Sequence, residues 1–163
     1  MQIRQGKEEN LDRIAWIHAQ SWHPTYTGLI DQVFLDTRTP QDSRRRLRLL
    51  RHQTFLVVED QRQLWGFLSF EINRQCGEIH ALYLLSQAQG RGWGRALMQE
   101  ALRQMRQQGC REIVLWVLPQ NLRAVRFYEK AGFCADGAQQ WVRYGQPVRI
   151  VRMRYQKKQE EQS

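Results

Sequence analysis

Hydrophobic positions along the 163-residue chain alternate between helical and strand spacing. Leu11, Ile14 and Ala15 follow the i, i+3, i+4 pattern of an amphipathic helix over residues 8–20. Proline and glycine in the aromatic segment 22–28 are expected to end that helix. The same kind of pattern predicts further helices at about 40–52, from the end of a glycine-rich turn to about 108, and at 121–131.

Strand-like runs fill the intervals between these helices. They lie at residues 2–5, 54–58, 64–72, 78–85, 112–118, 133–144 and 148–155. Strand–helix–strand units give parallel neighbours, whereas hairpins give antiparallel ones, so the order predicts a mixed α+β class. The length fits one domain, which we expect over residues 1–156, followed by a polar tail at 157–163.

Composition narrows the function classes. The chain carries 25 Lys and Arg against 16 Asp and Glu, a net charge of +9, which attracts anions. The densest basic run, between residues 44 and 51, is a solvated helix face or a nucleic-acid site. No helix-turn-helix, zinc or RRM-like motif supports a nucleic-acid partner. No apolar run is long enough for a membrane span, and no secretory signal opens the chain.

The three cysteines, Cys76, Cys110 and Cys134, are odd in number and include no CxxC pair. This pattern is neither a disulfide framework nor a zinc-ligand motif. We therefore expect free thiols in a reducing cytoplasm, and no metal.

The glycine-rich turn follows the strand predicted at 78–85 and opens a helix. Glycines at 90, 92 and 94 let backbone N–H groups approach an anion, and a helix N-terminus adds positive potential. Taken alone, the turn is a phosphate site or a simple tight turn. Arg95-Ala96 after Gly94 excludes the Walker pattern, and the GxGxG spacing excludes the dinucleotide fingerprint.

A third pattern fits this turn. Residues 89–94 read Q-x-x-G-x-G, which resembles the acetyl-coenzyme A signature of GNAT acetyltransferases. Residues 121–133 are similar to that family's N-x-x-A-x-x-F-Y-x-K-x-G-F helix, and residues 78–84 to its fourth strand. The resemblance implies a GNAT fold, a mostly antiparallel sheet splayed in the middle with about four flanking helices. It also implies transfer of acetyl from acetyl-coenzyme A to a primary amine of a small molecule or peptide, and it allows a homodimer.

The resemblance assigns the cosubstrate contacts largely to the main chain. The pantetheine arm is expected beside Leu82, Tyr83 and Leu84, with the Leu84 N–H facing the thioester oxygen. Asn121 and Ala124 are expected near the arm, although Asn121 alternatively serves as a helix N-cap. The pyrophosphate is expected on the backbone of Gln89, Gly90, Arg91, Gly92, Trp93, Gly94 and Arg95.

Catalytic roles follow from the same resemblance. Tyr128 is expected to protonate the departing thiolate, the alternative being a core aromatic. Glu78 is the candidate base and His80 a candidate relay, unless both are ordinary strand residues. Trp22 and Tyr26 are expected to wall the acceptor site or to pin their own segment.

Two other functions remain open on the sequence alone: a basic nucleic-acid-binding module, and a catalytically silent acyl-coenzyme A sensor of the same fold. The acceptor itself also remains open among polyamines, amino acids, antibiotic amines and protein amines.

Overall fold

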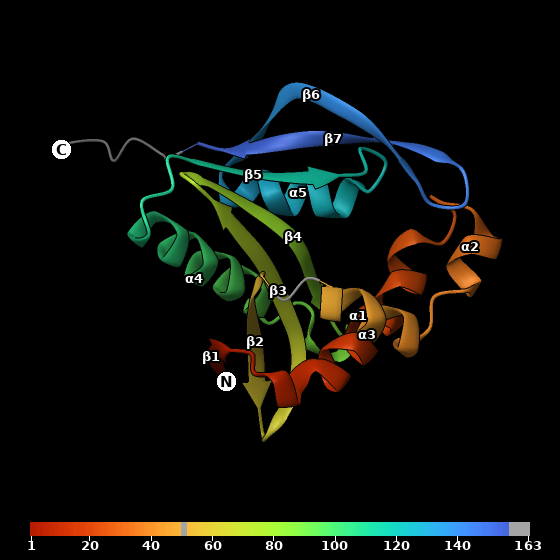
Figure 1. Ribbon diagram of the computed structural model, residues 1–163, viewed down its shortest axis with the longest axis horizontal. Coiled ribbons are helices and arrows are strands. Elements are labelled where there is room, and N and C mark those ends of the chain that lie inside the picture. The colour runs from red at the N-terminus through yellow and green to blue at the C-terminus, as the bar shows by residue number, and fades with distance from the viewer. Residues whose placement is uncertain (50–51, 157–163) are drawn as a thin grey trace.

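The computed structural model describes residues 1–49 and 52–156 (Figure 1). The predicted tail at 157–163, and Arg51 at the predicted end of the second helix, lie outside this range. The elements in chain order are β1 (Gln2–Gln5), η1 (Glu8–Asn10), α1 (Leu11–Tyr26), α2 (Gln32–Asp36), α3 (Pro40–Leu49), β2 (Thr54–Asp60), β3 (Gln63–Asn73), β4 (Cys76–Leu84), η2 (Ser86–Ala88), α4 (Trp93–Gln107), β5 (Glu112–Val117), α5 (Leu122–Ala131), β6 (Phe133–Arg143) and β7 (Pro147–Tyr155).

The strands form one seven-stranded sheet in the order β1-β2-β3-β4-β5-β7-β6. Its neighbours are antiparallel except for β4 and β5, which run parallel. The predicted mixed, mostly antiparallel sheet is thereby confirmed. The parallel pair arises because α4 carries the chain from the end of β4 back to the start of β5.

The sheet is splayed between β4 and β5. Their register runs only from Cys76 opposite Glu112 to Ile79 opposite Leu115. Beyond that point β5 stays paired with β7, while the second half of β4 has a neighbour only in β3. Figure 1 shows the two strands diverging from their shared end. The described residues therefore leave one edge of β4 open from His80 to Leu84.

A β-bulge marks the point where the splay begins. Ser69 of β3 lies opposite Ala81, but the next residue, Phe70, lies opposite Ile79, so His80 is an extra residue in β4. Bulges of this kind bend a strand and redirect its side chains.

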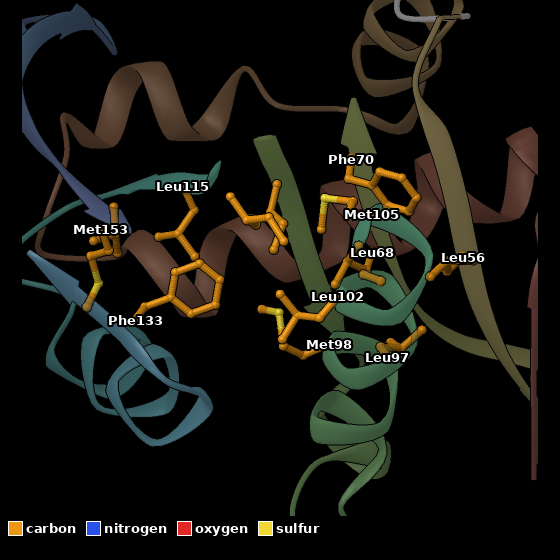
Figure 2. Packing of buried hydrophobic residues seen from close by; sticks show 14 of the residues in the cluster. Leu56, Leu68, Phe70, Leu97, Met98, Leu102, Met105, Leu115, Phe133 and Met153 are labelled. Carbon is orange, nitrogen blue, oxygen red and sulfur yellow. The ribbon is translucent and has the colours of Figure 1, made fainter. Parts of the chain in front are cut away.

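Helices cover both faces of the sheet. On one face α4 places Leu97, Met98, Leu102 and Met105 against Leu68 and neighbouring sheet residues, as Figure 2 shows. On the other face α1 packs Ile14 and Ile17 against Phe55 and Phe67. Burial of each large apolar side chain contributes about 1.5–3 kcal/mol, which holds the splayed sheet in place.

The helix count differs from the prediction. The described residues contain five α-helices, because the short α2 was not predicted from the sequence. None of them is long and apolar enough to cross a membrane.

The end of α1 also differs. The helix continues through Pro24 and ends at Tyr26, so it ends within the segment 22–28 but later than residue 20, where the sequence placed its end. Pro24 removes only the hydrogen bond to the carbonyl of Gln20, which is exposed and open to water. The rings of Trp22 and Tyr26 stack with centroids 4.7 Å apart, and this contact stabilises the last turn.

Candidate active site

The glycine turn leaves backbone donors free at the start of α4. The first helical hydrogen bond runs from the N–H of Ala96 to the carbonyl of Gly92, at 3.1 Å. The N–H groups of Trp93, Gly94 and Arg95 precede that bond and have no helical acceptor. No acidic residue lies in the first turn of α4. The turn is therefore suited to an anion, as the sequence predicted.

The three glycines of the turn are there for two different reasons. Gly90 and Gly92 have φ angles of +77° and +81°, which strain any residue with a side chain, although a Cβ at either position would meet nothing within 4 Å. A Cβ on Gly94 would instead lie 3.3 Å from Leu84 Cδ1 and 3.5 Å from the Phe127 ring. Gly90 and Gly92 shape the turn, whereas Gly94 lets α4 approach β4 and α5 closely.

The Gln89 side chain links this turn to the splay. Its Nε2 donates to the Leu84 carbonyl at 3.1 Å, and its Oε1 accepts from Arg123 of α5 at 2.7 Å. The sequence prediction used only the backbone of Gln89 and missed Arg123. No motif in the sequence marks Arg123, because its partner lies 34 residues away.

The open edge of β4 presents the main chain of Leu84. Leu85 donates its N–H to the carbonyl of Trp65 on β3, at 2.9 Å. Successive residues of a strand direct their N–H and C=O groups to opposite edges, so those of Leu84 point into the gap toward β5. This is the orientation that the predicted contact with a thioester oxygen requires.

Tyr128 lies half-buried on α5, with its ring centroid 5.6 Å from Phe127 and 6.1 Å from Phe133. No described residue hydrogen-bonds its hydroxyl, yet that oxygen is not sealed from solvent. Burial, and then the neighbouring Tyr26, raise the pKa of Tyr128. The hydroxyl consequently stays protonated and available as a donor.

A pair of phenols lies on the α1 side of the splay. The hydroxyls of Tyr26 and Tyr83 are 3.1 Å apart. Burial raises the pKa of Tyr26 to about 12. The Tyr83 side chain points toward α1, while the flanking Leu82 and Leu84 pack with α4. Side chains from α1, β4 and α5 thus meet where β4 leaves β5.

His18 holds the aromatic side chains of α1 in place. Its Nε2 accepts from the Trp22 indole N–H at 2.9 Å, which puts the ring proton on Nδ1, 2.7 Å from Ser43 Oγ. Burial, then Arg46 and Arg38, lower the pKa of His18 to about 4. Trp22 is only 5% exposed, so it packs behind the predicted acceptor wall and presents little surface to it.

Arginines gather at this same end of the molecule. The Arg38 guanidinium lies 4.1 Å from the centroid of Phe34 and 5.4 Å from that of Trp22. Arg44 forms an ion pair with Asp12. The basic run predicted as a solvated face is therefore partly engaged, and Arg46 and Arg38 act on buried groups such as His18 and Tyr144.

Glu78 and His80 come together on β4, as predicted. His80 Nε2 lies 3.1 Å from Glu78 Oε2 and also 3.1 Å from Glu71 Oε2 on β3. Glu71 stands directly opposite Glu78 in the antiparallel register. The sequence prediction missed Glu71, because pairing the facing ends of the strands predicted at 64–72 and 78–85 places Ile72 opposite Glu78, whereas the observed register places Glu71 there.

Asn121 caps α5. Its Oδ1 accepts the N–H of Ala124 at 3.3 Å, which is the N-cap arrangement kept open as an alternative. Ala124 and Asn121 are both half-buried, near the start of the helix that carries Tyr128.

Comparisons with known proteins agree with this arrangement. The sequence model of the acetyltransferase (GNAT) family matches residues 11–133. The uncharacterized N-acetyltransferase YuaI of Bacillus subtilis (strain 168) is 29% identical over 133 residues, covering 78% of this chain and 76% of that protein. The spermidine N(1)-acetyltransferase of Thermoplasma acidophilum is 28% identical over 141 residues, 82% of this chain and 88% of that protein.

Among solved structures, the fold is similar to that of PaiA N-acetyltransferase from Thermoplasma acidophilum in complex with coenzyme A. The TM-score is 0.75 at 23% identity, covering 96% of this chain and all (100%) of that one.

Proposed function

The chain belongs to the acetyltransferase (GNAT) family, and from that premise we propose that it transfers the acetyl group of acetyl-coenzyme A directly to a primary amine in one ternary complex. The observation that carries the proposal is the gap between β4 and β5, with free backbone donors of the glycine turn at one end and Tyr128 beside it. The whole activity is assigned to the domain at 1–156.

The residues at the gap fit the cosubstrate. A diphosphate would bind the unpaired N–H groups at the start of α4, with Arg91 and Arg95 adding positive charge. The amide-bearing arm would pair with the open edge of β4 along Leu82–Leu84, as an added strand does. Asn121 and Ala124, at the start of α5, would lie beside the same arm. When bound, acetyl-coenzyme A supplies the activated acetyl group.

The proposed chemistry moves two protons. The acceptor arrives as an ammonium, and Glu78, with His80 beside it, takes the first proton so that the nitrogen can attack the thioester carbon. A C–N bond forms and the C–S bond breaks, while the Leu84 N–H stabilises the negative charge that develops on the oxygen. Tyr128 protonates the thiolate and regains its proton from the nitrogen side. The net products are the amide, the free thiol and one proton released to water.

The acceptor side favours a particular class of amine. A relative at 28% identity is named a spermidine acetyltransferase. Here, however, Arg38 and Arg46 place positive charge around Tyr144 and His18. Repulsion between cations disfavours a polyamine, so we propose an amine with no more than one positive charge, such as an amino acid or a peptide N-terminus. Tyr26 and Tyr83 would line its entry.

A cytoplasmic location is part of the proposal. Cys76, Cys110 and Cys134 are all free thiols, as a reducing compartment would keep them.

The test is an acetylation screen. The protein is incubated with acetyl-coenzyme A and matched panels of amino acids, peptides and polyamines, and thiol release is followed with a chromogenic disulfide. We expect turnover to be fastest with the singly charged amines. Calorimetry that detects no binding of acetyl-coenzyme A would overturn the proposal, and preference for spermidine would overturn only the acceptor class.

A further inference from the structure

Three metal-ligating side chains converge on the β3–β4 hairpin. The donor atoms of Glu71, Glu78 and His80 all lie within 4.8 Å of one another. His52, just before β2, lies beside this group, with its Nε2 3.3 Å from Glu71 Oε2. One imidazole nitrogen and two carboxylates are donors that suit a divalent transition-metal ion with water in its fourth position.

The fold brings these side chains together by register. Glu71 and Glu78 face one another across the antiparallel pair, an arrangement in which like charges repel. His80 is the extra residue of the bulge and reaches both carboxylates. A positive charge between the two glutamates would remove the repulsion.

The distances suit a metal better than a simple hydrogen-bond network. A ring nitrogen carries at most one proton and can direct it at only one acceptor, yet His80 Nε2 lies 3.1 Å from two carboxylate oxygens. With zinc–ligand bonds of about 2.0–2.2 Å, neighbouring ligand atoms of a tetrahedron lie about 3.3–3.6 Å apart. The separations of His80 Nε2 from Glu71 Oε2 and from Glu78 Oε2, 3.1 Å each, are close to that spacing.

We propose that Glu71, Glu78 and His80 bind a divalent transition-metal ion, with water in the remaining position and Zn²⁺ the best fit. Mg²⁺ and Ca²⁺ prefer all-oxygen sites and are not expected to compete. One consequence rests on the proposed function: a metal-bound Glu78 cannot take a proton from the acceptor, so zinc would act as an inhibitor of acetyl transfer.

Binding is tested without acetyl-coenzyme A, so a failed acetylation assay leaves this test intact. Tag-free protein treated with chelator is titrated with ZnCl₂ by calorimetry, and with MgCl₂ in parallel. We expect one equivalent of zinc to bind, with release of protons, and no heat from magnesium. Cobalt(II) added to the wild-type protein should develop the strong visible absorption of a tetrahedral site, a readout that needs no variant.

Single substitutions test which residues bind the zinc ion. Glu71→Gln and His80→Ala should each weaken zinc binding by at least about 10-fold. His23→Ala removes a different partly exposed histidine, and Cys134→Ser the exposed thiol, so both should bind zinc like the wild type. The proposal is overturned if zinc does not bind, if His80→Ala binds it unchanged, or if magnesium binds equally well.

Discussion

The two sides of the splay between β4 and β5 present different chemical groups, main-chain atoms on one side and side chains on the other. On the side of α4 and α5, the features suited to the cosubstrate are main-chain groups: the N–H groups at the start of α4 and the open edge of β4. On the side of α1 and α3, the features are side chains: the Tyr26–Tyr83 pair, the His18 network and the arginines around them.

This difference bears on how each side can vary. A surface made of backbone requires little of its side chains except glycine where φ is positive and small size where elements approach. A surface made of side chains can change its preference with each substitution, while the fold stays the same. We therefore expect changes on the first side to affect acetyl-coenzyme A, and changes on the second to affect the amine.

The largest effect is expected from Tyr128→Phe, the one side chain on the cosubstrate side to which we assign chemistry. Loss of the proton donor should lower kcat by about 100- to 1,000-fold, with little change in the KM for acetyl-coenzyme A. Stability should hold, because no described residue bonds the hydroxyl. Steady-state kinetics and thermal unfolding check both statements. A loss of less than about threefold would assign the acid role elsewhere.

The next largest effect is expected on stability, when His18 in the side-chain network of α1 is protonated. The folded protein binds a proton at His18 only near pH 4, against 6.5 in the unfolded chain, so acid favours unfolding. Stability from this group is present above pH 6.5 and is lost as the pH falls toward 4, about 3 kcal/mol in all. Urea unfolding at several pH values should show this loss in the wild type and a smaller one in His18→Gln. If the free energy of unfolding fell equally with pH in the wild type and in His18→Gln, His18 would be excluded as the cause.

Gly92→Ala tests whether backbone shape is what the turn contributes. Its φ of +81° should cost about 1–2 kcal/mol of stability with any side chain, and the KM for acetyl-coenzyme A should rise about 10-fold. Gly109→Ala is the matched control, since φ there is +86° and a Cβ likewise meets nothing within 4 Å. If both variants lose stability equally and only the first changes the KM, the turn is a binding element. A similar rise of the KM for acetyl-coenzyme A in both variants would contradict a binding role of the turn.

The smallest effect is expected from Tyr26→Phe, which leaves the hydroxyl of Tyr83 without its partner. Stability should fall by about 1 kcal/mol, and the KM for the amine should rise a few-fold while that for acetyl-coenzyme A stays constant. Denaturant unfolding and kinetics at saturating acetyl-coenzyme A measure the two. If only the KM for acetyl-coenzyme A changed, the assignment of the α1 side to the amine would be wrong.

The sequence predicted most of the fold, and it marked the glycine turn and the start of α5, because those features are local. The glycines, the cap at Asn121 and the strand before the turn lie in two short stretches of chain, and their periodicity and spacing are visible without the fold. The same locality explains one mistake: Pro24 suggested a helix end, but packing of Trp22 and Tyr26 outweighed the lost hydrogen bond.

Non-local contacts could not be read in the same way. Arg123 meets Gln89 only after α5 and the glycine turn, 34 residues apart, are assembled. Glu71 meets Glu78 and His80 only once the register of the β3–β4 hairpin is set. The short α2 has little periodicity of its own. The expectation of no metal rested on cysteine spacing, whereas the zinc site proposed above uses glutamates and a histidine of two neighbouring strands.

The splay has a further consequence for handling the protein. From His80 to Leu84, β4 offers main-chain groups to which no strand among the described residues is bonded on the β5 side, in the middle of a sheet. Such an open edge is a template for another chain, and at Leu84 the side chain of Gln89 donates a hydrogen bond to it. Storage without coenzyme A should therefore favour aggregation of the protein. Bound coenzyme A should cover the open edge of β4 and keep the protein monodisperse.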